Sequence, residues 1–185
     1  MNELPRPNNW QTAASIILDS VFDLAGTSAV ANCPDINGCF DAVIREFDYL
    51  VDDVFNPDGY EMDGIEELIN DIAAYAFHAY SLTADISQPM AVNEIFNTLV
   101  SKQRMYGQGN IARFGLPGIV IRLNDKIERL KNLQQHEGPV IFEPIKDTWL
   151  DIVGYSVIAI MWINDWFLLE LKKDSISKKI TKETK

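Results

Sequence analysis

Apolar residues recur at intervals of three and four along most of this 185-residue chain, which is the spacing of one helix face. Hydrophobic residues make up 47% of the chain, enough to build a core. No segment shows a convincing strand pattern. The helical spacing covers six ranges: 10–26, 39–55, 65–82, 91–106, 119–133 and 143–173. The sequence therefore predicts an all-α fold, a bundle of about six helices.

The segments between these ranges are rich in Gly, Pro, Asn and Asp, which are typical of turns. We expect a single domain over residues 1–173, with N-terminal helices within 10–85 and C-terminal helices within 91–173. The Lys-rich segment 174–185 is expected to be a flexible tail. Three segments are expected to be loops: 32–40, 107–118 and 134–142.

Acidic residues outnumber basic ones, 27 to 16, which gives a formal net charge of −11. A nucleic-acid or membrane-surface binder needs a basic patch, so the charge disfavours both classes. The longest apolar run, 152–171, is interrupted by charged residues and does not predict a spanning helix. The two cysteines make no disulfide framework, and the first ten residues lack the pattern of a signal peptide. We expect a cytoplasmic protein.

Two segments, 67–79 and 147–159, share the pattern acid-x-x-x-Asp-Ile-x-x-Tyr-x-x-x-Ala. Each follows an acidic predicted helix. Amphipathic helices share their period by necessity, so coincidence is the alternative to a repeat. Three residues recur at a spacing of eighty: Glu67, Asp71 and Tyr75 correspond to Asp147, Asp151 and Tyr155. This pattern indicates two related helical hairpins in one chain.

Three carboxylates stand four residues apart at the start of the last predicted helix: Glu143, Asp147 and Asp151. Residues at this spacing share one helix face, where like charges repel weakly. Apolar residues crowd Asp151, and burial disfavours an unpaired charge. Mg²⁺ prefers carboxylate oxygens and would offset the repulsion. The alternatives are therefore a metal site and a solvated face.

The preceding predicted helix carries both signs of charge within two turns: Arg122, Asp125, Lys126, Glu128 and Arg129. A mixture of this kind is usual on an exposed, salt-bridged face. In the functional alternative, Asp125 reaches the same metal and Lys126 or an arginine binds phosphate, since arginine suits bidentate phosphate contacts. The residues alone leave both alternatives open.

Three short motifs lie within residues 102–165: Tyr106-Gly107, Arg122-x-x-Asp125-Lys126-x-x-Arg129-Leu130, and Glu143-x-x-x-Asp147-Thr148-x-x-Asp151 followed by Tyr155. With these motifs, residues 102–165 resemble the nucleotide modification associated domain 1 family, which is common in phages. That family is similar to the MazG-like all-α NTP pyrophosphatases, which use Mg²⁺ to cleave a nucleoside triphosphate to a monophosphate and pyrophosphate. The acids of the last predicted helix depart from the three-residue spacing of those enzymes, because they are four residues apart.

The resemblance implies a pyrophosphohydrolase of a nucleotide or deoxynucleotide, dependent on Mg²⁺ or Mn²⁺. Glu128 or Glu143 would be the general base. The other implied roles are metal ligation by Asp125, Asp147 and Asp151, phosphate binding by Arg122, Lys126 and Arg129, and base binding by Tyr106, Phe114 and Tyr155. The departure in spacing keeps two alternatives open: a module that binds or sequesters nucleotide without turnover, and a helical interaction protein.

Relatives of this kind often complete their bundle with a second copy, so a homo-oligomer is one option. The N-terminal half offers another, because its acidic helices could supply the partner hairpin, and a second or working site, within one chain. The acids concerned are Glu46, Asp48, Glu67 and Asp71.

Overall fold

The computed structural model describes residues 6–33, 35–56, 58–59, 62–135 and 142–172. Within these ranges the chain forms seven α-helices and no strand. The prediction of an all-α fold is confirmed. In chain order the helices are α1 (Trp10–Ala25), α2 (Ser28–Ala31), α3 (Ile36–Val54), α4 (Met62–Ala84), α5 (Gln88–Tyr106), α6 (Gly109–Gln135) and α7 (Phe142–Ile163).

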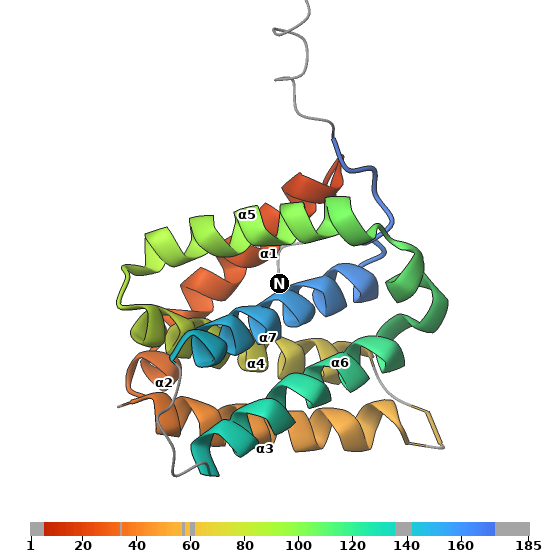
Figure 1. The fold of residues 1–185 in the computed structure, drawn as a ribbon. Helices are drawn as coiled ribbons and strands as arrows, with labels where there is room; N and C mark the ends of the chain where they lie inside the picture. The colour runs from red at the N-terminus through yellow and green to blue at the C-terminus, as the bar shows by residue number, and fades with distance from the viewer. Residues whose placement is uncertain (1–5, 34, 57, 60–61, 136–141, 173–185) are drawn as a thin grey trace, which may run out of the picture.

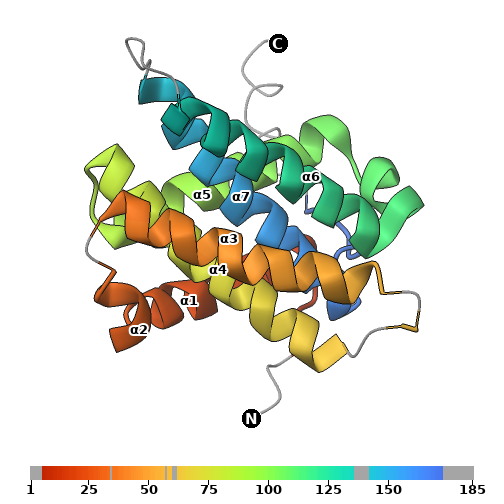
Figure 2. The ribbon, with the colours of Figure 1, turned by 90° about the horizontal axis from the view of Figure 1, so that it is seen from below.

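The six longer helices form three layers of two, as Figure 1 shows. α4 and α7 are the central pair and pack against each other along their length. α1 and α5 lie on one side of this pair, and α3 and α6 on the other (Figures 1 and 2). The central helices run antiparallel, because Asn164 after α7 donates a hydrogen bond to Glu66 near the start of α4 at 3.0 Å.

Buried side chains from all seven helices form one apolar cluster. Edge-to-face aromatic pairs join its layers: Phe40 of α3 and Trp149 of α7 have ring centres 6.3 Å apart. Phe22 of α1 and Phe77 of α4 have ring centres 6.4 Å apart. Apolar burial contributes about 25 cal/mol per Å². Tertiary packing of this kind, more than helix propensity, holds the helices in place.

The hairpin of α3 and α4 recurs eighty residues later as α6 and α7. Adding eighty to the bounds of α4 gives 142–164, and α7 spans Phe142–Ile163. The same shift carries α3 onto 116–134, which is α6 beyond a kink at Gly115. Buried positions coincide as well: Cys39, Phe40, Val43, Phe47 and Leu50 match Ile119, Val120, Leu123, Ile127 and Leu130. The helix bounds and buried positions of the two hairpins therefore correspond at this spacing.

Two of the expected loops contain helix. The segment 107–118 is mostly helical, because α6 already begins at Gly109 and only Gly115 departs from helical geometry inside it. The segment 32–40 contains the start of α3, which Asp35 caps by accepting a hydrogen bond from the Gly38 N–H at 2.9 Å. Glycine, asparagine and aspartate inside a helix lower its stability without forbidding it, so turn-like composition misleads at both places.

The last helix is shorter than the expected range 143–173, because α7 ends at Ile163. Asp165 adopts a left-handed conformation, with φ 58°, which stops the helix. The Trp166 N–H then donates to the Met161 carbonyl at 2.8 Å, and the chain folds back over the core. No helix in the described ranges is long and apolar enough to cross a membrane. The expected tail, 174–185, lies outside the described residues.

The kink in α6 depends on Gly115, whose φ of 58° and ψ of −149° disfavour other residues. A Cβ added at Gly115 would also lie 3.2 Å from Cζ2 of Trp162 on α7. The glycine therefore allows α6 to turn while staying in close contact with α7.

We expect Gly115→Ala to lower the free energy of unfolding by about 1–3 kcal/mol, from backbone strain and crowding. Urea denaturation measures the change. Gly64→Ala is the matched control, because Gly64 lies in the first turn of α4 with nothing within 4 Å of an added Cβ. It should be neutral or stabilising by up to about 1 kcal/mol. Equal stability of the two variants would contradict the role of Gly115.

Candidate functional site

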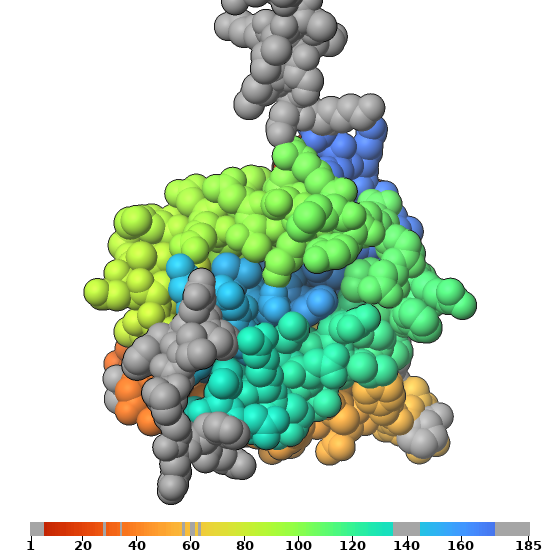
Figure 3. Space-filling model, in the orientation of Figure 1, coloured from red at the N-terminus to blue at the C-terminus, as the bar shows by residue number. Residues whose placement is uncertain are grey.

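A cavity of about 410 Å³ opens between α5, α6 and α7, and we call it the α5–α6–α7 pocket. Figure 3 shows α7 at its floor, between the rims that α5 and α6 form. Its size falls in the range of small-molecule sites, roughly 300–1,000 Å³. Leu99, Ile111, Leu150 and Ile158 supply apolar walls. The polar and charged lining consists of Thr98, Lys102, Gln103, Tyr106, Asn110, Arg122, Lys126, Asp151 and Tyr155.

Four-residue spacing on two helices aims the key side chains into this pocket. Arg122 and Lys126 share one face of α6, and Asp151 and Tyr155 share one face of α7. Gly154 lies between the last two, and a Cβ there would approach a leucine of α5 to 3.3 Å. The small residue thus lets α5 come close enough for its polar side chains to reach α7.

Asp151 lies where the charges of the pocket meet. Lys102 of α5 donates a hydrogen bond to its Oδ1, and Nζ of Lys126 lies 2.8 Å from its Oδ2. The Asp151 side chain is only 18% exposed. Burial favours the protonated carboxyl, but the hydrogen bonds and charges of both lysines outweigh burial and hold the pKa of Asp151 below its usual value. Asp151 is therefore an ionised carboxylate held between two ammonium groups.

The pocket is cationic although the chain as a whole is acidic. Lys102, Arg122 and Lys126 carry positive charge in its lining, against the single carboxylate of Asp151. The whole chain carries a formal charge of −11. Positive charge concentrated in a concave site attracts anions. The arrangement can bind an anionic group while the lining tyrosines contact a flat, less polar part of the same ligand.

The residues predicted to bind phosphate and base largely meet here. Tyr106, Arg122, Lys126 and Tyr155 all line the pocket. Arg129 does not, although it stands only three residues after Lys126; it lines a separate depression on α6. The structure therefore places most of the residues predicted to bind ligand in one pocket.

The predicted metal ligands and bases do not meet among the described side chains. Asp125 and Glu128 line the separate depression on α6, where Glu128 pairs with a lysine of its own helix at 2.7 Å. Asp147 is exposed, Asp151 is held by two lysines, and the side chain of Glu143 lies outside the described residues. No three His, Cys, Asp or Glu side chains gather to hold a metal ion within the described ranges. The described side chains of this set show no shared position for Mg²⁺ or Mn²⁺, so we derive no step through a metal.

Acidic residues approach one another on the other hairpin. Glu46 of α3 pairs with Arg45 at 2.8 Å. Burial, followed by the charges of Glu46 and Glu67, raises the pKa of Asp71 above its usual value, and Arg45 partly opposes this. Asp71 stands at the position equivalent to Asp151, eighty residues earlier. The two equivalent aspartates therefore have opposite surroundings: Asp71 lies near carboxylates, and Asp151 lies between ammonium groups.

The raised pKa of Asp71 predicts a pH-dependent gain in stability for Asp71→Asn. Because the folded-state pKa exceeds the unfolded one, Asp71 stabilises the fold when protonated, and this contribution is lost as pH rises through the folded pKa. At pH 7 the variant should gain about 0.5 kcal/mol by removing like-charge repulsion. Urea denaturation at pH 7 and at acid pH measures the difference, which should disappear in acid. Asp48→Asn, on the exposed side of α3, should show neither effect.

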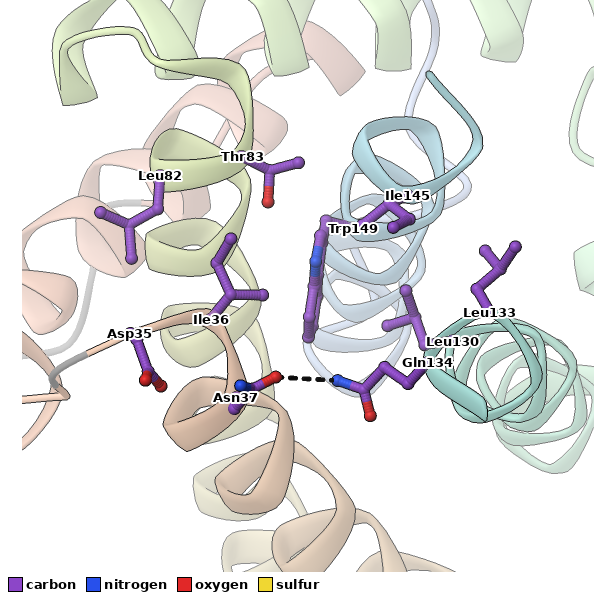
Figure 4. Close-up of a pocket in the computed structure, with 10 residues that line it drawn as sticks. All are labelled: Asp35, Ile36, Asn37, Leu82, Thr83, Leu130, Leu133, Gln134, Ile145 and Trp149. Atoms are coloured by element: carbon purple, nitrogen blue, oxygen red, sulfur yellow. Dashed lines mark hydrogen bonds between the residues drawn. The ribbon is translucent and has the colours of Figure 1, made fainter. Parts of the chain in front are cut away.

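A larger cavity, about 490 Å³, lies between the starts of α3 and α7 and the ends of α4 and α6 (Figure 4). Asp35 supplies the charge in its described lining and already caps α3. Asn37 and Gln134 bond across it at 3.4 Å, a weak contact. Its other lining is mainly apolar: Ile36, Leu82, Leu130, Leu133, Ile145 and Trp149. Convergent charges are found in the smaller α5–α6–α7 pocket, which we take as the candidate site.

Four polar or charged lining residues of the pocket were not among the predicted site residues: Thr98, Lys102, Gln103 and Asn110. Lys102 stands four residues before Tyr106 on α5, so helical spacing alone puts both on one face. This spacing is the sequence signal that could have placed Lys102 beside Tyr106 in the site. The contact of Lys102 with a carboxylate 49 residues away depends on tertiary packing, which spacing does not predict.

Residues 118–163 match the sequence model of the family described as nucleotide modification associated domain 1. The match covers α7 and the part of α6 beyond its kink, which is the second hairpin. It includes Arg122, Lys126, Asp151 and Tyr155, and it is narrower than the expected resemblance over 102–165. No curated protein and no solved structure matches the chain. The match supports the family at the hairpin that forms one side of the pocket.

Proposed function

We propose that the α5–α6–α7 pocket binds a phosphorylated nucleotide, in keeping with a phage-type nucleotide modification associated domain. The observation that carries this proposal is the convergence of Lys102 and Lys126, from two helices, with Arg122 in the same lining. Hydrogen bonds to charged groups contribute about 1.5–3 kcal/mol each. Three such contacts support roughly micromolar affinity without any metal ion.

The aromatic lining supports a nucleotide over a simple phosphate. Tyr106 is 74% exposed at the pocket, and Tyr155 is partly buried in the lining. Stacking of a base on an aromatic ring contributes about 1–3 kcal/mol where it has been tested by alanine substitution. The family description names nucleotides, and the matched residues 118–163 hold the α6 and α7 lining of the pocket.

Pyrophosphohydrolysis of a (d)NTP with Mg²⁺ or Mn²⁺, as in the MazG-like enzymes, is the second candidate. The repulsion between Glu46, Glu67 and Asp71, which contributes to the raised pKa of Asp71, favours it, because a divalent cation would relieve that repulsion. The described side chains nevertheless form no three-membered metal group, so this candidate ranks below nucleotide binding.

One screen tests both candidates. Nucleoside monophosphates and triphosphates, ribo and deoxy, are added to the wild-type protein in EDTA and then with Mg²⁺ or Mn²⁺. Melting temperature and calorimetry report binding, because a ligand specific to the native state raises the melting temperature. We expect at least one nucleotide to bind in EDTA. Release of pyrophosphate only with metal would establish the second candidate, and no binding under any condition would favour a helical interaction protein over both.

A further inference from the structure

Asp151 stands at the point of the α5–α6–α7 pocket where an anionic ligand would meet the two ammonium groups. Lys102 donates to one carboxylate oxygen, and Lys126 contacts the other at 2.8 Å. The carboxylate is 18% exposed, while Lys102 is 43% exposed and open to the pocket. The chain thus presents its own oxyanion to the donors that would bind the phosphate of a ligand.

We propose that Asp151 is an internal competitor for the phosphate of the ligand, and that it makes the pocket selective for phosphate dianions over singly charged anions. The proposal rests on the proposed function of the same pocket. The carboxylate takes one hydrogen bond from each lysine, so a ligand binds only when it interacts with the lysines more strongly than Asp151 does.

Charge and tethering together give this selectivity. A free carboxylate or a phosphodiester carries the same single charge as Asp151 and would replace it like for like. Because the Asp151 carboxylate is tethered to the chain, it competes at an effective concentration on the order of millimolar or more. A singly charged ligand that displaces it therefore gains little binding free energy. A terminal phosphate carries up to two charges and three acceptor oxygens, and it can engage Arg122 together with both lysines.

The equivalent position in the first hairpin indicates that the lysines are not needed to hold the helices together. Asp71 is the equivalent of Asp151, eighty residues earlier. The equivalent of Lys126 is Glu46, whose negative charge acts on Asp71. α3 and α4 nevertheless pack as closely as α6 and α7. The paired ammonium groups around Asp151 are therefore a feature of this pocket and not of the hairpin design.

Asp151→Asn tests the proposal, since it keeps the shape of the side chain and removes its charge. Inorganic phosphate and acetate are each titrated into wild type and variant by calorimetry, in EDTA at neutral pH. We expect the variant to bind phosphate about tenfold more tightly than wild type. We also expect it to bind acetate, which should not bind measurably to wild type. Asp19→Asn, on the exposed face of α1, removes the same charge elsewhere and should match wild type.

The outcomes separate this proposal from the proposed function. Unchanged or weaker phosphate binding in Asp151→Asn, with that binding lost when Lys102→Met and Lys126→Met are added to the variant, would overturn the competitor role alone. Absence of phosphate and nucleotide binding in both proteins would overturn the proposed function and the competitor role with it.

A measurement on wild type keeps the test valid if Asp151→Asn does not fold. The ¹³Cγ resonance of Asp151 should shift as phosphate saturates the pocket, because the carboxylate loses hydrogen bonds from its two lysines. The shift should follow the same saturation curve as the calorimetric binding. A resonance that stays fixed while phosphate binds would contradict the competitor role.

Discussion

Replacing Lys102 and Lys126 together by Met should weaken nucleotide binding by at least about 100-fold. The two ammonium groups come from different helices and contact different oxygens of Asp151. We therefore expect each lysine to make its own contact with the phosphate. Methionine retains an unbranched, flexible, apolar side chain but donates no hydrogen bond. Calorimetry with the nucleotide that the screen identifies measures the loss.

The double change needs a background that protects the fold. Removing both lysines leaves Asp151 largely buried and unpaired, and breaking a buried ion pair costs about 3–5 kcal/mol. The triple variant with Asp151→Asn is therefore compared with Asp151→Asn alone. Lys131→Met is the matched control, because Lys131 also lies on α6 but pairs with Glu128 at 2.7 Å. Affinity that survives the triple change would place the nucleotide site elsewhere.

Trp149→Ala should lower the free energy of unfolding by about 3–5 kcal/mol, the largest stability effect that we expect. Trp149 is 1% exposed on α7, in the central pair of helices. Its ring packs edge to face on Phe40 at 6.3 Å between centres and so connects α7 to α3. Truncation removes this contact and leaves a void that rigid helices cannot fill. Urea denaturation at equilibrium measures the loss.

Trp149→Phe is the matched control for the volume of the side chain. The indole Nε1 of Trp149 is buried and makes no hydrogen bond within the described part of the chain, so phenylalanine gives up no polar contact. We expect this variant to lose less than half of the stability that Trp149→Ala loses. Equal losses in the two variants would show that the indole ring makes a contact that packing volume does not explain.

Helical spacing predicted the core well, because burial on one face is a local property of each helix. It failed where a single backbone angle or a tertiary contact decides the structure. α6 contains three glycines within 109–118, yet only Gly115 leaves helical geometry there, and its contact with Trp162 is non-local. The last predicted helix is apolar through Leu171, but a left-handed Asp165 ends its regular hydrogen bonding.

The repeat was visible in the sequence as a faint pattern and is far clearer in the structure. Few residues are identical at the spacing of eighty, yet helix bounds and buried positions coincide. Burial tolerates exchange among apolar residues, such as Phe47 for Ile127 or Ile69 for Trp149, so a shared fold persists when identities are lost.

Only some of the residues that line the pocket were predicted, because tertiary packing decides which helices meet there. The resemblance named four residues of α6 and α7 that line the pocket: Arg122, Lys126, Asp151 and Tyr155. Sequence spacing could not reveal that Lys102 of α5 reaches Asp151, because the angle between helices is set by packing. The line of carboxylates on α7 predicted a metal ligand at Asp151, whereas its observed partners are two lysines. A carboxylate binds either kind of cation, and sequence spacing does not distinguish them.

A crystal structure of the protein with a bound nucleoside monophosphate, grown in EDTA, tests the assignment of the α5–α6–α7 pocket most directly. We predict the phosphate between the Nζ atoms of Lys102 and Lys126, at hydrogen-bond distances of about 2.7–3.2 Å, with Arg122 on the same phosphate. The carboxylate of Asp151 should have moved away from at least one lysine. A nucleotide bound anywhere else, with the Asp151 ion pairs unchanged, would contradict the assignment.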